Sequence, residues 1–169
     1  MNPLVCVTGV ESSGKTASAQ AIADFFGWAF VPEAARTDAA VREFRTGPDD
    51  LVRLADQQRS AISACLARTA AVSDACPLVL EVWARVAFGC CPVDSFADQQ
   101  RVDLFLLCAP DLPWEPDPLR VFPDANRRWE IHRLFESLLQ ERGLPYLLLQ
   151  GSGEARWHSV LPKLRALSE

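Results

Sequence analysis

The chain contains no long apolar run, no Cys-x-x-Cys pair and no excess of positive charge. No stretch approaches the ~18 apolar residues of a membrane-spanning helix, so we expect no membrane partner. Lys and Arg total 17 against 22 Asp and Glu, a net charge of -5, whereas proteins that bind nucleic acid through its phosphates usually carry the opposite sign. Six cysteines without metal-site spacing and only two histidines disfavour a zinc site and predict reduced thiols in a cytoplasmic protein.

Short apolar segments alternate with helical patterns along the 169 residues. This alternation predicts an α/β fold with a five-stranded, mostly parallel sheet and helices on both faces. Strands are expected at 4–8, 28–31, 78–82, 102–108 and 145–149, and helices at 15–26, 33–44, 50–75, 84–100, 126–142 and 154–167. Residues 110–124 include five prolines and show no periodicity. We therefore expect a single domain over 1–169 with a short Pro-rich lid near 110–128.

The segment 9–16, GVESSGKT, fits the pattern G-x-x-x-x-G-K-[ST] of a phosphate-binding loop, or P-loop. It follows an apolar strand and precedes an Ala-rich helix, which is the context that this motif requires. Glycines let the loop turn its backbone N–H groups towards a phosphate, and the N-terminus of the helix faces the same anion. The interpretation is a three-layer P-loop NTPase fold, in which the nucleotide contacts come from Gly9, Glu11, Ser12, Ser13, Gly14, Lys15, Thr16 and Ala17.

Two side chains of this motif define the expected cofactors. Lys15 is expected to reach the β- and γ-phosphates of ATP, and Thr16 offers its hydroxyl to Mg²⁺. The chain has neither an Asn-Lys-x-Asp motif for guanine nor a G-x-G-x-x-G dinucleotide fingerprint. Its size and its Pro-rich segment favour a small-molecule kinase over a GTPase or a mechanical ATPase.

Charged side chains are expected at the carboxyl ends of the strands, where open α/β sheets bind ligands. Glu33 and Arg36 follow the second predicted strand, and they either face the site or form a surface ion pair. Glu81 stands in the predicted strand 78–82, where it would hold Mg²⁺ or accept the proton of the substrate hydroxyl. The alternative for Glu81 is a structural pair with Arg85.

The Pro-rich segment adds aromatic and cationic candidates. Trp114 could stack on a flat ring, and Arg120, Arg127 or Arg128 could neutralise charge on the transferring phosphoryl group. The alternatives are a tryptophan that covers the edge of the sheet and arginines on a solvated helix.

Taken in order, these segments resemble the ATP-binding nicotinamide riboside kinase domain of the bacterial NAD-biosynthesis regulator and its stand-alone relatives. The shared features are G-x-E-S-S-G-K-[ST] at 9–16, P-E-x-x-R at 32–36, a D-x-x-x-[LIM]-A block at 50–55 with Gln58 after it, D-x-x-L-L-C-x-P-D-x-P-W-x-x-D-x-x-R at 103–120, and R-G-L-P-Y at 142–146. The likeness covers nearly the whole chain, and the Pro-Asp-x-Pro-Trp signature is more specific than the P-loop.

The resemblance implies phosphoryl transfer from ATP to the 5′-hydroxyl of a nucleoside such as nicotinamide riboside. The candidate catalytic residues are Lys15, Glu81 and Arg120, and the candidate metal ligands are Thr16 and Glu81. The residues that the resemblance implies around the substrate or the lid are Glu33, Arg36, Trp114, Asp117 and Arg120. The expected partners are a nucleoside triphosphate and a small-molecule acceptor, without nucleic acid.

One departure from the family concerns the third predicted strand. The family usually carries Asp-Thr-Asp after this strand, whereas residues 81–83 read Glu-Val-Trp. Trp83 would then replace the second acid. This leaves open another acceptor, or an ATPase or nucleotide-binding switch without small-molecule kinase activity.

Overall fold

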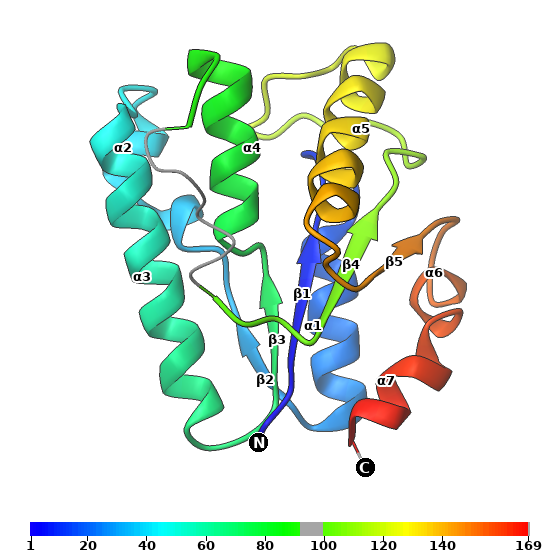
Figure 1. The fold of residues 1–169 in the computed structure, drawn as a ribbon. Coiled ribbons are helices and arrows are strands. Elements are labelled where there is room, and N and C mark those ends of the chain that lie inside the picture. Colours follow the sequence, from blue (N-terminus) through cyan, green and yellow to red (C-terminus); the bar gives the residue numbers. More distant parts are fainter. Residues whose placement is uncertain (92–99, 169) are drawn as a thin grey trace.

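A five-stranded parallel sheet forms the centre of the molecule (Figure 1). The computed structural model describes residues 1–91 and 100–168. The strands are β1 Leu4–Thr8, β2 Ala29–Val31, β3 Ala71–Asp74, β4 Leu104–Cys108 and β5 Tyr146–Leu149. Their spatial order is β2-β3-β1-β4-β5, and all four neighbouring pairs are parallel. All five carboxyl ends therefore lie at one edge of the sheet, as the sequence predicted for a P-loop fold.

Helices cover both faces of the sheet, which confirms the predicted three layers. The helices are α1 Lys15–Phe26, η1 Ala34–Thr37, α2 Ala39–Arg42, α3 Pro48–Leu66, α4 Pro77–Phe88, α5 Ala125–Glu141, α6 Ala155–His158 and α7 Leu161–Ser168. Helices α3, α4 and α5 pack on one face, and α1 with α6 and α7 packs on the other. Among residues 1–91 and 100–168, no helix has the length and apolar composition that crossing a membrane requires.

The apolar core has two halves because successive side chains of a strand point to opposite faces. In β1, Leu4 and Cys6 face the layer of α3, α4 and α5, whereas Val5 and Val7 face α1 and α7. All four side chains are completely buried. A central parallel strand is buried on both faces, so its sequence is a continuous apolar run.

The third strand is not where the sequence predicted it. Residues 78–82 lie within helix α4, and β3 is the segment Ala71–Asp74 that the prediction assigned to the end of a helix. Pro77 begins α4, where its missing N–H removes no helical hydrogen bond, and Glu81 pairs with Arg85 one turn later. The prediction failed because a short apolar run is compatible with a buried strand and with a buried helix.

The other differences concern helix ends. The predicted helix 33–44 is divided at Asp38, whose carboxylate accepts hydrogen bonds from the Ala40 and Val41 amides and caps α2. Helix α3 ends at Leu66, and the predicted helix 154–167 is divided into α6 and α7. Helix α4 ends at Phe88, before the end expected for the segment 84–100, and residues 92–99 of that segment lie outside the described residues.

Candidate active site

The P-loop connects the end of β1 to the start of α1, and two of its glycines have conformations that L side chains rarely adopt. Gly9 has φ 135° and Gly14 has φ 79°. A Cβ atom on Gly9 would lie 2.8 Å from the carbonyl oxygen of Cys108, and one on Gly14 would lie 2.9 Å from the side chain of Leu112. Both positions therefore require glycine, for the backbone angle and for the space.

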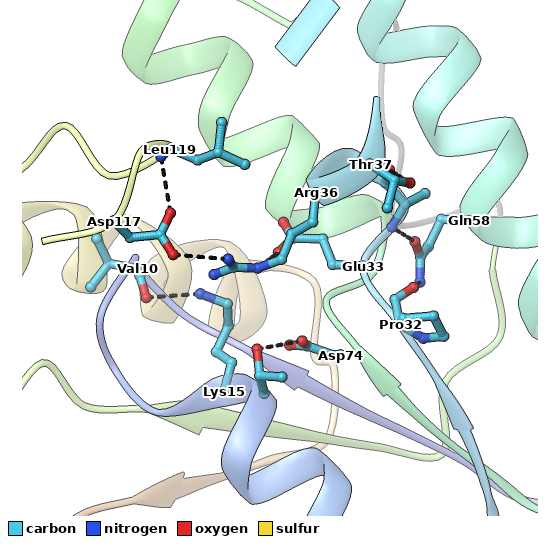
Figure 2. A network of polar contacts seen from close by, with 12 residues as sticks. Val10, Lys15, Pro32, Glu33, Arg36, Thr37, Gln58, Asp74, Asp117 and Leu119 are labelled. Carbon is cyan, nitrogen blue, oxygen red and sulfur yellow. Dashed lines mark hydrogen bonds and ion pairs between the residues drawn. The ribbon is translucent and has the colours of Figure 1, made fainter. Parts of the chain in front are cut away.

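Lys15 and Thr16 occupy the first turn of α1. The ammonium group of Lys15 donates a hydrogen bond to the carbonyl oxygen of Val10 at 2.9 Å, which folds the side chain back over the loop (Figure 2). The hydroxyl of Thr16 donates a hydrogen bond of 2.6 Å to the carboxylate of Asp74. The loop, the ammonium and the hydroxyl–carboxylate pair together mark the place where a nucleotide's phosphates would bind.

Asp74 is the acidic residue that sequence reasoning missed. It ends β3, and the pairing of β3 with β1 sets it beside Val7, next to the start of the P-loop. Ala75 then adopts φ 69° and donates its N–H to the Val7 carbonyl oxygen, so the chain turns away into α4. The local sequence offers one indication of this position: Asp74 ends the short segment Ala71–Asp74, three positions before Pro77.

Glu81 lies within helix α4 and not at a strand end beside the P-loop, so the structure gives no support to its assignment as a metal ligand and catalytic residue. The side chain is completely buried on α4, where Arg142 donates two hydrogen bonds of 2.9 and 2.5 Å and Arg85 one of 3.1 Å. Burial by itself would raise the pKa of Glu81, but these hydrogen bonds outweigh it and hold the pKa below its ordinary value. The alternative of a structural pair with Arg85 is the correct one, with Arg142 as an additional partner. Trp83 lies on the same helix and does not follow β3, so it does not stand in for the family's second acid.

Glu33 and Arg36 do approach the P-loop, together with Asp117 of the Pro-rich segment (Figure 2). The guanidinium of Arg36 lies 3.5 Å from the carboxylate of Glu33 and 3.2 Å from that of Asp117. Burial raises the pKa of Glu33, although the nearby charges of Lys15 and Arg36 act in the opposite direction. Hydrogen bonds from the Leu119 amide and from Arg36 lower the pKa of Asp117. The two carboxylates therefore differ in how readily they take up a proton.

The segment that carries Glu33 is held in place by Gln58 of α3. The side-chain carbonyl oxygen of Gln58 accepts the N–H of Ala34 at 2.8 Å, and its amide group donates to the carbonyl oxygen of Pro32 at 3.2 Å and to the hydroxyl of Ser73 at 3.0 Å. Gln58 is buried and has partners for both ends of its amide. It thus ties the end of β2 to β3, and it positions Glu33 relative to Asp74.

The Pro-rich segment is attached to the P-loop by Glu11. One carboxylate accepts the indole N–H of Trp114 at 3.1 Å and the backbone N–H groups of Val121 and Phe122 at 2.9 and 2.6 Å. Trp114 is therefore hydrogen-bonded to the loop, and it is not among the described residues that line the neighbouring cavity. The predicted stacking of Trp114 on a substrate ring has no support in this arrangement.

The three candidate arginines of this region have different surroundings. Arg120 donates to the carbonyl oxygen of Glu115 at 2.6 Å and lies 3.4 Å from the Ser12 hydroxyl, so it lies over the P-loop. Arg127 forms an exposed ion pair with Glu130. Arg128 is buried and donates to the Leu112 carbonyl oxygen at 3.4 Å. Of the three, Arg120 is the one with a described contact to the P-loop.

Arg156 of α6 forms a hydrogen bond to the backbone of the P-loop, a contact that the sequence did not indicate. Its guanidinium is almost completely buried and donates to the carbonyl oxygens of Ser13 at 3.0 Å and of Ala109 at 2.7 Å. It also forms an ion pair of 2.6 Å with Asp111 and a hydrogen bond with the carbonyl oxygen of Gly151. The loops that follow β1, β4 and β5 are thereby joined at one side chain.

A cavity of about 220 Å³ opens beside the P-loop. Its polar lining comes from Gly9, Glu11, Lys15, Glu33, Arg36, Thr46 and Arg120. The remaining walls come from helices α3, α4 and α5 and from the segments around Phe44 and Phe122. A molecule in this cavity would have one end next to the Lys15 ammonium and the Glu33 carboxylate.

The residues around Thr16 fit a Mg²⁺ ion bound together with a nucleotide. The second carboxylate oxygen of Asp74, Oδ1, is buried and has no hydrogen-bond partner among the described residues, and neither has the hydroxyl of Thr8. Mg²⁺ is usually bound by one or two protein oxygens together with phosphate oxygens and waters. The residues that would hold it are Thr16 and Asp74.

Comparison with solved structures supports the fold assignment. The chain is similar to the NadR protein in its crystal structures with NAD and AMP-PNP (TM-score 0.75, 22% identity) and with NR (TM-score 0.73, 22% identity). These matches cover 98% of this chain but 49% and 51% of the NadR chains, so the chain spans about half of their length. Deoxyadenosine kinase from M. mycoides, with the products dCMP and dCDP, matches at a TM-score of 0.69 and 11% identity, over 96% of this chain and 99% of that one.

The predicted resemblance to the nicotinamide riboside kinase domain is thus confirmed as a likeness of fold. Thymidylate kinase from Ehrlichia chaffeensis shares the fold at a TM-score of 0.61 and 11% identity, over 99% of each chain. No curated protein matches the chain. The family model described as "AAA domain" matches residues 4–156, a region that contains β1 to β5, the P-loop, Asp74 and Glu33, and the chain therefore belongs to the AAA domain family.

Proposed function

We propose that the protein transfers the γ-phosphoryl group of ATP to a hydroxyl group of a small molecule. The observation that carries this proposal is the shared cavity: Lys15 of the P-loop and the Glu33 carboxylate line the same space, next to the Thr16–Asp74 pair. A nucleotide-binding loop alone requires no room for a second substrate. A cavity that begins at the phosphate site provides that room.

In this proposal, the P-loop residues hold and orient the triphosphate. The backbone N–H groups of residues 9–14 and the N-terminus of α1 surround the phosphates, and the Lys15 ammonium neutralises charge on the β- and γ-phosphates. Thr16 and Asp74 would hold Mg²⁺, which supplies further neutralisation of charge on the phosphate oxygens. Arg120 would reach the γ-phosphoryl group from the Pro-rich segment.

Glu33 is proposed as the proton acceptor. The acceptor's hydroxyl oxygen forms a bond to the γ-phosphorus while the bond from that phosphorus to the β–γ bridging oxygen breaks, so ADP leaves and the hydroxyl proton passes to Glu33. Burial raises the pKa of this carboxyl group, which makes it a stronger base than a solvated glutamate. Arg36 orients the carboxylate through their 3.5 Å ion pair.

The acceptor to test first is nicotinamide riboside, at its 5′-hydroxyl. The support for it is the likeness of fold to NadR, whose crystal structure holds NR. The alternative, an ATPase or switch without an acceptor, was motivated by Trp83 in place of an acid. Asp74, at the end of β3 beside β1, supplies the first of the family's two acids, but Cys76 stands at the place of the second, so the alternative is kept as an outcome of the test.

The direct test is an incubation of the protein with ATP, Mg²⁺ and a panel of ribosides that includes nicotinamide riboside. ADP release and the mass of the phosphorylated product are followed together. The proposal expects ADP release that depends on an acceptor and a product heavier by one phosphoryl group. Equal ADP release with and without every acceptor would identify an ATPase and contradict the proposal.

A further inference from the structure

One turn of the Pro-rich segment connects the P-loop to the residues around Glu33. The carbonyl oxygen of Asp117 accepts the N–H of Arg120 at 3.0 Å, which closes the turn 117–120. From this turn, the Arg120 guanidinium lies 3.4 Å from the Ser12 hydroxyl of the P-loop, and the Asp117 carboxylate lies against Arg36 (Figure 2). The contact between Arg120 and the P-loop therefore also fixes where Asp117 lies.

Both carboxylate oxygens of Asp117 have partners within the protein. Oδ1 accepts the backbone N–H of Leu119 at 2.9 Å, and Oδ2 accepts a hydrogen bond from the Arg36 guanidinium at 3.2 Å. Asp117 is not among the described residues that line the cavity, whereas Glu33, Arg36 and Arg120 are. The Asp117 carboxylate is therefore engaged inside the protein, and it acts on a molecule in the cavity only through the side chain that it holds.

Arg36 needs this second partner to keep one orientation. Its Nε lies 3.5 Å from the carboxylate of Glu33, and its Nη1 lies 3.2 Å from that of Asp117. The Arg36 side chain is 42% exposed, and one exposed ion pair contributes too little to stop the guanidinium from rotating. Carboxylates on two different nitrogens fix the plane of the guanidinium. Asp117 thus determines how Arg36 faces Glu33.

Four charged groups from four segments act on Glu33. They are Lys15 of α1, Asp74 of β3, Arg36 of η1 and Asp117 of the Pro-rich segment; the two cations lower the pKa of Glu33, and the two acids raise it. Arg36 by itself would orient Glu33 and also make it a weaker base. Asp117 offsets this charge while it holds the guanidinium in place. Glu33 is therefore oriented by a cation and still keeps the basicity that burial gives it.

We propose that Asp117 is a positioning residue, which holds the Arg36 guanidinium so that Arg36 directs the Glu33 carboxylate at the acceptor's hydroxyl group. The inference rests on the proposed function, because Glu33 is the proton acceptor of that reaction. In this role Asp117 touches neither substrate, and its effect passes through Arg36. The role differs from the place around the substrate that the family resemblance implied for Asp117.

Asp117→Asn tests the hold on Arg36 without any substrate. With its oxygen on the Leu119 amide, the asparagine turns its NH₂ group to Arg36, donor against donor. Nuclear magnetic relaxation of the Arg36 Nε, assigned by the signal that Arg36→Gln removes, measures the order of the guanidinium. We expect an order parameter above about 0.6 in the wild type and below about 0.6 in Asp117→Asn. Glu115→Gln, which changes an exposed side chain of the same segment, should leave the order parameter unchanged.

A double-mutant cycle with Arg36→Gln tests the effect on the reaction. With ATP, Mg²⁺ and the riboside that the wild type turns over fastest, Asp117→Asn should lower kcat about tenfold, the effect of about one charge-assisted hydrogen bond. The KM for ATP and the Kd of AMP-PNP should stay within about twofold of the wild type, because the P-loop is unchanged. In the Arg36→Gln background, Asp117→Asn should lower kcat by less than about twofold.

The outcomes separate this inference from the proposed function. The inference is overturned by an Arg36 order parameter or a kcat that Asp117→Asn leaves unchanged, and also by an equal loss of kcat with and without Arg36. In each of these cases, phosphorylation of a riboside by the wild type still supports the kinase. If the order parameter falls in Asp117→Asn but the wild type phosphorylates no riboside, the positioning of Arg36 by Asp117 stands and the kinase proposal fails.

Discussion

The hydroxyl of Thr16 lies 2.6 Å from the carboxylate of Asp74, although 58 positions separate the two residues in the chain. The contact forms because β3 pairs with β1 in parallel register, with Val7 opposite Asp74. Thr16 opens the helix that follows β1, so both side chains reach the same edge of the sheet. The pair places Asp74 beside the first turn of α1, which Glu81 on α4 does not contact among the described hydrogen bonds.

Asp74→Asn should therefore slow phosphoryl transfer and weaken the binding of Mg²⁺. Removing the negative charge is expected to lower kcat by about a hundredfold or more and to shift the Mg²⁺ concentration for half-maximal activity upwards. Steady-state ADP release over a Mg²⁺ titration measures both. Glu81→Gln, assayed at a temperature where it is folded, should keep the Mg²⁺ dependence of the wild type. A Mg²⁺ shift in Glu81→Gln without one in Asp74→Asn would reverse the assignment.

Lys15→Ala should remove most of the phosphoryl transfer. The ammonium is the cation that the P-loop directs at the phosphates, and losing one such preorganised group typically costs a hundredfold or more in kcat. The matched control is Lys163→Ala, an exposed lysine on α7, which should behave as the wild type. Lys15→Ala with undiminished acceptor phosphorylation would remove the P-loop from the mechanism.

Glu33→Gln should abolish a pH dependence that the wild type shows. Burial raises the Glu33 pKa above its ordinary value of 4.5, and the carboxylate accepts a proton only in its ionised form. Wild-type kcat/KM should therefore fall as the pH is lowered through this raised pKa. The variant should be slower at every pH and should lack this acidic limb.

A control for the Glu33 profile is Glu43→Gln, which changes an exposed carboxylate at the end of α2. Its kcat/KM profile should match the wild type. An acidic limb that persists unchanged in Glu33→Gln would assign the titration to another group.

Glu81→Gln should lower stability rather than turnover. Replacing the buried carboxylate weakens the charged hydrogen bonds from Arg142 and Arg85, which we expect to cost about 2 kcal/mol in the free energy of unfolding at neutral pH. Because the folded-state pKa of Glu81 is lowered, its contribution is present above the ordinary carboxyl pKa and is lost as the pH falls through the folded value. Urea unfolding of both proteins measures the difference.

The stability gap between wild type and Glu81→Gln should thus narrow on going from pH 7 towards the acidic range below pH ~4.5. A gap that stays constant over this range would show that the ion pair contributes no net electrostatic stabilisation.

Glu11→Gln should loosen the attachment of the Pro-rich segment to the P-loop. The variant exchanges charge-assisted hydrogen bonds to the Val121 and Phe122 amides for neutral ones, so their hydrogen exchange should be about tenfold faster. Glu115→Gln, which alters an exposed side chain in the same segment, is the control. Unchanged protection in Glu11→Gln would mean that other contacts hold the segment.

Much of this protein was predictable from local sequence. The P-loop combines glycine, lysine and threonine at fixed spacing, so the sequence placed residues Gly9 to Thr16 correctly between a strand and a helix. The continuous apolar runs at β1 and β4 follow from burial on both faces of a parallel sheet. Glu33 and Arg36 lie at the predicted strand end because they are adjacent in the chain to β2.

Local sequence patterns did not predict strand β3 or the position of Asp74 at its end. Ala71–Asp74 is a four-residue segment with two polar side chains, whereas Leu78–Val82 is more apolar and β-branched, and local preference favours the wrong segment as the strand. The packing of α4 across α3 and α5 makes the second segment a buried helix. Tertiary packing overrides local preference in such a case.

The sequence by itself determined that this chain is a P-loop α/β protein, because motif, strand and helix patterns are encoded by residues close together in the chain. Only the tertiary structure decided which carboxylate lies beside Thr16, where Trp114 is anchored, and which helices form the walls of the neighbouring cavity. These features depend on pairs such as Thr16 with Asp74, Glu11 with Trp114 and Glu81 with Arg142. Their members are distant in the chain, and only the register of the sheet and the packing of helices on it bring them together.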